Sequence, residues 1–140
     1  MARGAGLFGL VAALAVAAGC SSEPKLAQMS GKVTFKGKPV PAGYISFTPD
    51  FGQKGEVRVV QIKDGVYDSS KEQTPGIFPG PCVVRIAGYN GNAEKFYPQG
   101  KQIFNLYEFK DTVTDGTTTK DFTVPDKYGQ NVKHEPTADE

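Results

Sequence analysis

Few side chains in this sequence could act as nucleophiles or metal ligands. The 140 residues include one histidine, His134, and two cysteines, Cys20 and Cys82. A single histidine excludes a histidine-based metal triad, and cysteines this far apart form no CxxC pair. His134 lies in a polar C-terminal stretch, where we expect it to be solvated.

The carboxylates are scattered close to the ends of the expected strands. They are Asp64, Asp68, Asp111, Asp115 and Asp121. None has the spacing of a calcium-binding loop, and no pair is placed for acid–base work in a cleft. Two of them precede glycine, and an Asp-Gly pair is a turn signal. We therefore expect no catalytic residue, no metal and no cofactor, and a protein that is not an enzyme.

Cys20 follows a segment with the features of an export signal. Arg3 and the start amine make the N-terminus positive, and residues 5–18 form an uncharged run rich in Ala, Leu and Val. That run has the length of a signal-peptide core. It is shorter than the roughly 20 residues that a membrane-spanning helix needs.

The run ends in Ala17-Ala-Gly-Cys-Ser-Ser, which resembles the lipobox of bacterial lipoproteins, although Ala17 stands where the box usually has Leu. The resemblance implies cleavage after Gly19 and acylation of Cys20 with diacylglycerol and a fatty acid such as palmitate. Two or three acyl chains anchor a protein stably. Ser21, in a position where Asp would favour the inner membrane, favours the outer membrane. The alternative is an ordinary secretory signal with release into the periplasm.

The composition after residue 19 is that of a β protein. The remaining 121 residues carry equal numbers of basic and acidic side chains, with 26 β-branched and 14 aromatic residues. Such side chains suit a pleated, half-buried surface. We expect a signal peptide at 1–19, a tether at 20–28, the domain at 29–125 and a polar tail at 126–140.

Alternation of apolar and polar residues predicts about seven short strands. They are expected at 30–37, 44–48, 56–63, 66–68, 82–88, 103–114 and 117–124. The residues expected to point inward include Val33, Phe35, Ile45, Phe47, Phe122 and Val124. Short strands separated by turn residues predict a seven-stranded antiparallel β-sandwich.

Glycines and prolines recur at coupled positions along residues 31–88. The pattern runs Gly31-x-Val33-x-Phe35-x-Gly37-x-Pro39, Gly43-x-Ile45-x-Phe47, Asp64-Gly65-x-Tyr67 and Gly76-Ile-x-Pro79-Gly80-x-x-Val83, ending at Gly88. It resembles carboxypeptidase regulatory-like (transthyretin-like) domains, especially the small lipoproteins of this kind in planctomycetes. The resemblance implies Greek-key topology and an accessory or adhesive module. The hydroxyisourate hydrolases of this fold use several histidines that this chain lacks.

Cys82 begins an apolar alternating strand and shares a face with Val84 and Ile86. We interpret it as a small buried hydrophobic residue. An exposed thiol, able to form an intermolecular disulfide in an oxidising compartment, is the alternative.

The loop at 89–100 is the most distinctive segment for ligand binding. Its candidate ligand-contact residues are Tyr89, Asn90, Asn92, Phe96 and Tyr97. Rings combined with amides suit a glycan or peptide surface, although the absence of Trp weakens a sugar-stacking role. The alternative, which we favour, is that these rings cap one end of the sandwich.

Charge balance helps to choose among partners. Nucleic-acid-binding domains carry a clear basic excess, and with 16 basic and 15 acidic residues this chain has none. Five basic residues could form a patch for anionic lipid or polysaccharide, although a solvated face is the interpretation that we favour: Lys32, Lys36, Lys38, Lys54 and Arg58. We expect a lipid-anchored envelope protein with a non-enzymatic structural or interaction module, whose partners are the membrane, envelope proteins or polysaccharide. A carbohydrate- or peptide-binding module using the 89–100 loop is the alternative.

Overall fold

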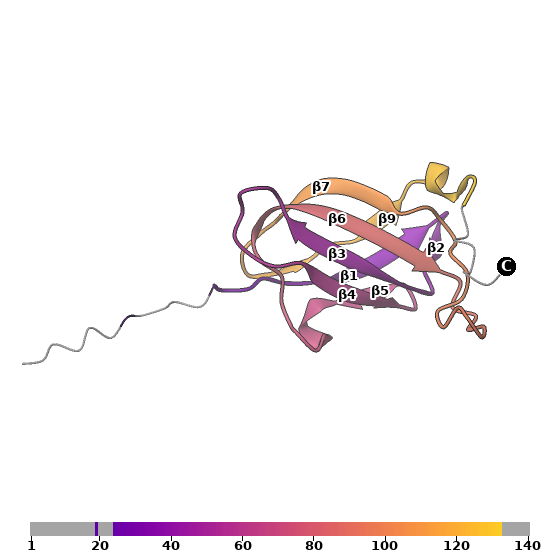
Figure 1. Ribbon diagram of the computed structural model, residues 1–140, viewed down its shortest axis with the longest axis horizontal. Coiled ribbons are helices and arrows are strands. Elements are labelled where there is room, and N and C mark those ends of the chain that lie inside the picture. The colour runs from indigo at the N-terminus through magenta and orange to yellow at the C-terminus, as the bar shows by residue number, and fades with distance from the viewer. Residues whose placement is uncertain (1–18, 20–23, 133–140) are drawn as a thin grey trace, which may run out of the picture.

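Strands make up most of the regular structure of the computed structural model, which describes residues 19 and 24–132 (Figure 1). No α-helix occurs among these residues, and none of their helices is long and apolar enough to cross a membrane. The expectation of an all-β protein is therefore confirmed. Cys20, residues 1–18 of the expected signal peptide and His134 lie outside the described residues.

The strands form one curled sheet. They are β1 (Gln28–Phe35), β2 (Lys38–Pro39), β3 (Ala42–Pro49), β4 (Arg58–Lys63), β5 (Val66–Asp68), β6 (Gly80–Tyr89), β7 (Tyr107–Val113), β8 (Thr117–Thr119) and β9 (Phe122–Val124). Antiparallel pairs give the order β2-β1-β5-β4-β3-β6-β7, and β8 and β9 both pair with β1. Two short 3₁₀ helices, η1 (Ser69–Lys71) and η2 (Asp126–Gly129), complete the described elements.

Strand alternation is confirmed where the sequence shows it most clearly. Val33 of β1, Ile45 of β3 and Ile86 of β6 are fully buried, and Phe47 is nearly so. In β1 the neighbours of Val33, Lys32 and Thr34, are more exposed, because successive side chains of a strand point to opposite faces. β7 starts four residues later than expected, at Tyr107.

The expectation of seven strands, all antiparallel, is wrong near the C-terminus. Residues 117–124, expected to be one strand, form β8 and β9, and both run parallel to β1. Between them Lys120 and Asp121 turn toward β1, where the Asp121 carboxylate accepts a hydrogen bond from the Lys32 N–H at 2.8 Å. Gly31 permits this approach, because a Cβ there would overlap the Lys120 carbonyl oxygen. With β2 added, the described residues contain nine strands.

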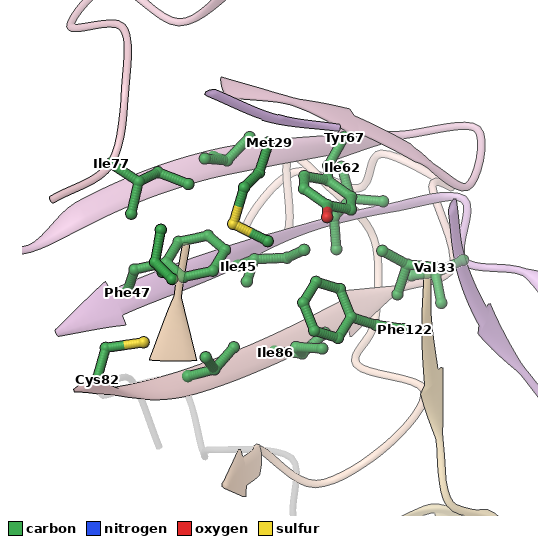
Figure 2. Packing of buried hydrophobic residues seen from close by; sticks show 14 of the residues in the cluster. Met29, Val33, Ile45, Phe47, Ile62, Tyr67, Ile77, Cys82, Ile86 and Phe122 are labelled. Atoms are coloured by element: carbon green, nitrogen blue, oxygen red, sulfur yellow. The ribbon is translucent and has the colours of Figure 1, made fainter. Parts of the chain in front are cut away.

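The hydrophobic core lies between the two halves of the curled sheet. Figure 2 shows side chains from β1, β3, β6 and β9 pointing toward one another there. The residues that it labels are Met29, Val33, Ile45, Phe47, Ile62, Tyr67, Ile77, Cys82, Ile86 and Phe122. All of them belong to one buried cluster, so a single core supports the whole sheet.

The curled sheet has two ends, which we call the base and the tip. The base comprises residues 24–27, 50–57, 69–79 and 114–116, and the tip comprises 36–41, 64–65, 90–106 and 125–130. The chain enters at the base, and the long β6–β7 connection lies at the opposite end (Figure 1). At the base, the Ala27 N–H donates to the Ile77 carbonyl at 2.8 Å and Gly55 packs against Phe78.

The tip includes part of the segment expected to be a polar tail. Tyr128 of η2 packs against Tyr107, with ring centroids 4.8 Å apart. Its carbonyl also accepts a hydrogen bond from the Asn105 N–H at 2.7 Å. The packed body therefore continues through η2, just as it includes the fully buried Ala27 at the base.

Candidate functional site

The 89–100 loop is held in one shape by backbone hydrogen bonds. Asn90 and Gly91 donate their N–H groups to the carbonyls of Lys101 and Gln99, each at 2.9 Å. A reciprocal pair of bonds joins Glu94 and Tyr97 at 2.9 and 3.0 Å. The loop is therefore a folded surface rather than an open connection.

The Asn90 side chain stabilises the inside of this loop. Its Oδ1 accepts hydrogen bonds from the Asn92 N–H at 2.9 Å and the Lys101 N–H at 3.2 Å. Gly100, with φ of 85°, packs directly against this amide, and a Cβ at that position would overlap Oδ1. The structure thus assigns Asn90 to support of the loop, with its Oδ1 already engaged.

The rings of the loop line a shallow groove of about 220 Å³ at the tip. Its walls come from Tyr44, Tyr89, Phe96, Tyr97, Pro98, Gln99 and Gly100. Three of the five candidate ligand-contact residues thus come together: Tyr89, Phe96 and Tyr97. Asn90 and Asn92 do not line the groove. We call this feature the tip groove.

Sequence reasoning missed Tyr44 as a residue of the tip groove. Tyr44 lies on β3 opposite Ala87, with its side chain on the outer face of the sheet. The signal available in the sequence was an aromatic residue at an outward position of an alternating strand. The pairing of β3 with β6, which carries Tyr44 to the loop, is not visible in the sequence.

The tip groove carries both charge signs at its rim and an amide in its wall. The Lys95 Nζ lies over the ring of Phe96, 5.2 Å from its centroid. The Lys101 Nζ lies 3.8 Å from the Glu94 Oε1. The Gln99 Oε1 is buried and has no hydrogen-bond partner among the described residues. An unpaired buried acceptor costs free energy.

Cys82 is buried, as expected. Burial raises the pKa of its thiol, and the nearby Asp111 carboxylate acts in the same direction. A neutral, enclosed thiol is a poor nucleophile. In Figure 2 the sulfur points into the core beside Phe47.

The five basic residues do not gather into one patch. Lys36 and Lys38 belong to the tip, whereas Lys54 belongs to the base. The Arg58 side chain is only 13% exposed, and its guanidinium lies over the Phe78 ring at 4.9 Å. The arrangement favours separate solvated charges and one packed arginine.

The described residues thus define an all-β domain with an aromatic groove at one end of a curled sheet. No family model matches the sequence, and no curated protein matches it. Among solved structures, one similar chain is a DUF3823 family protein from Parabacteroides merdae ATCC 43184. The identity is 15% and the TM-score is 0.43, with 72% of this chain and 46% of that chain covered. This chain therefore spans less than half of that protein.

Proposed function

We propose that this protein is a lipid-anchored protein of the bacterial cell envelope, and that its domain is a non-enzymatic interaction module. One observation carries the proposal: the chain enters the domain at the base, and the β6–β7 connection, whose rings line the tip groove, lies at the opposite end (Figure 1). An anchor at the base would hold the tip groove away from the membrane, where partners can reach it.

The sequence pattern supports a particular kind of module. The coupled glycines and prolines of residues 31–88 resemble those of carboxypeptidase regulatory-like domains. We therefore propose a transthyretin-like β-sandwich of Greek-key type, in which the curled sheet closes around its core. Domains of this kind commonly serve as accessory or adhesive parts. Fold alone assigns no activity, so the partner must come from the tip groove.

The anchor is the first part of the proposal to test. Acylation of Cys20 would place the protein in a membrane, with the outer membrane favoured by Ser21. Cells expressing the protein are labelled with a radioactive fatty acid, beside cells expressing Cys20→Ala. Label in the native protein and none in the variant supports the anchor. Equal labelling of the two proteins contradicts it.

A second candidate function is that the tip groove binds a carbohydrate or a peptide. The grouping of Tyr44, Tyr89 and Tyr97 with Phe96 favours it. Tyrosine rings provide stacking area together with a hydroxyl group. Surface binding of sugars or peptides needs both.

Glycan and peptide arrays test this second function. Saturable binding that Tyr97→Ala abolishes supports the tip groove, whereas Phe51→Ala, which removes an exposed ring at the base, serves as the matched control. Binding that survives Tyr97→Ala contradicts a role for this groove. No saturable binding on either array favours a partner protein of the envelope.

A further inference from the structure

An aromatic ring stands unsupported at the base of the domain. Phe51 is fully exposed, so no side chain of the residues that the structure describes covers its ring. Val57, at the other end of the same loop, is 53% exposed. A fully solvated phenylalanine contributes nothing to the core, because hydrophobic stabilisation requires removal of apolar area from water.

The turn that presents Phe51 is well held. The Asp50 N–H donates to the Pro81 carbonyl at 3.0 Å, and the Gln53 N–H donates to the Asp50 carbonyl at 2.9 Å. The Asp50 carboxylate accepts from the Phe51 N–H at 2.9 Å and lies 3.3 Å from the Lys110 Nζ. These bonds hold the pKa of Asp50 below its ordinary value, the Phe51 N–H being the largest cause. The exposed ring is therefore on a fixed turn.

The N-terminal segment leaves the domain at the same end. Ala27 is fully buried and pairs with Ile77, and Leu26 packs against Gly76. Phe78, two residues after Gly76, contacts Gly55 of the Phe51 loop. The segment that leads back to Cys20 and the loop that carries Phe51 thus both contact residues 76–78.

The length of that segment limits how far the base can be from a membrane. Between Cys20 and Ala27 an extended chain spans at most about 25 Å, at 3.3–3.6 Å per residue. A tether this short gives the base a high effective concentration at the bilayer surface. Even a weak interfacial affinity then suffices for contact.

We propose that the base of the domain docks on the lipid bilayer that holds the anchor, with Phe51 inserted at the boundary between headgroups and acyl chains. This inference rests on the proposed acylation of Cys20. Amphipathic helices that lie at this boundary bury their apolar side chains about 5–10 Å deep. Lys25 and Lys54, both exposed at the base, extend their ammonium groups toward lipid phosphates.

The charges of the base set the kind of membrane that docking requires. The base carries Lys25, Lys54 and Lys71 against Asp50, Glu56, Glu72 and Asp115, so it has no basic excess. Docking therefore depends on the tether and the apolar ring, and a zwitterionic bilayer is sufficient.

Tryptophan fluorescence tests the docking directly, because the chain contains no tryptophan. The full lipidated protein carrying Phe51→Trp is reconstituted into phosphatidylcholine vesicles. Phe96→Trp, at an exposed position of the tip, is the matched control. We expect the indole at position 51 to show a blue shift, quenching by brominated lipid and a several-fold loss of iodide quenching. The indole at position 96 should keep the emission and iodide quenching of a solvated ring.

The outcomes separate this inference from the proposed function. Protein that floats with the vesicles while the indole at position 51 stays fully accessible to iodide overturns the docking and leaves the anchor intact. Protein that fails to float overturns the anchor and the docking together. Identical lipid quenching at positions 51 and 96 also overturns the docking, because it means that the base is not the face that meets the bilayer.

Discussion

The base and the tip each present an exposed phenylalanine, and the two are supported differently. At the tip, Phe96 is 65% exposed, lies under the Lys95 ammonium and borders a groove with three tyrosines. At the base, Phe51 is fully exposed and has no ring partner among the described residues. A ring in a lined groove suits a ligand of defined shape, whereas an isolated ring on a fixed turn suits a surface without defined shape, such as a bilayer.

The buried residues beneath the two ends differ as well. The tip packs on Phe104, whose ring is fully buried. The centroid of this ring lies 5.0 Å from that of Phe35. The base rests on the smaller Ile77. Each end therefore has its own anchoring residue in the shared core, so we expect that each end can be destabilised separately.

Phe104→Ala should give the largest effect. Removal of a fully buried ring costs about 3–5 kcal/mol in free energy of unfolding, through lost transfer energy and the cavity left behind. Chemical denaturation measures the loss. Hydrogen exchange should show faster exchange of the Asn90 and Lys101 amides with little change at Ala27. Ile77→Ala should reverse that pattern, and equal loosening of both ends by each variant would contradict their independence.

Gly100→Ala at the tip and Gly116→Ala at the base form a matched pair. Their φ angles are 85° and 84°, so alanine meets the same backbone strain at both, about 1–2 kcal/mol. Gly116 has open space around a new Cβ, whereas at Gly100 the Cβ displaces the Asn90 amide. We expect Gly100→Ala to cost about 2 kcal/mol more, through two lost hydrogen bonds.

Thermal and denaturant unfolding of the two glycine variants provide the measurement. Equal losses would show that the Asn90 amide moves aside freely, and would remove it as the support of the loop. A larger loss at Gly116 would contradict the open surroundings of the base turn.

The sequence allowed prediction of those parts that depend on local pattern. Alternation places Val33, Ile45 and Ile86 inside, because period two is a property of the strand itself. The Asp64-Gly65 turn likewise follows from two adjacent residues, with Asp64 at φ of 51° and Gly65 at 75°. These features need no knowledge of distant segments.

The parts that were not predicted depend on contacts between distant segments. The split of residues 117–124 into β8 and β9 arises where the Lys120 carbonyl meets Gly31, and nothing near Lys120 indicates that contact. The tip groove needs Tyr44, brought from β3 by pairing with β6. Phe51 was not considered as a site, because a lone phenylalanine in a polar loop gives no sign of whether its ring is covered.

Tyr67→Phe tests the link between the two ends. β8 pairs with the start of β1 near the base, β9 pairs with its end near the tip, and the Tyr67 hydroxyl donates to the Lys120 carbonyl between them at 2.6 Å. Loss of this bond should cost about 1 kcal/mol at neutral pH. Both ends should loosen by the same amount, unlike in the variants of Phe104 and Ile77.

The pH dependence of the same variant gives a second measurement. Burial, with Asp121 and Asp111 nearby, raises the pKa of Tyr67 above its ordinary value of 10.0. Above that pH the unfolded chain has lost the phenolic proton that the folded chain still holds, so stability falls as pH rises. Tyr67→Phe should therefore lose less stability than the native protein between neutral and alkaline pH. An equal loss of stability in the two proteins would mean that another group causes the sensitivity to alkaline pH. The buried Cys82 thiol, whose pKa is also raised, is the next candidate.

Phe51→Ser should have the smallest effect on the free energy of unfolding. The variant can therefore separate a membrane role of the ring from a structural one. Because the ring is fully exposed, its replacement should change the free energy of unfolding by less than about 0.5 kcal/mol. Denaturant unfolding of the protein in the absence of membranes measures this. A loss above about 1 kcal/mol would show that the ring packs in solution, placing it with Phe104 as a structural residue. A negligible loss, together with weaker lipid contact of the base, would mean that the turn around Asp50 holds a ring whose only partner lies outside the protein.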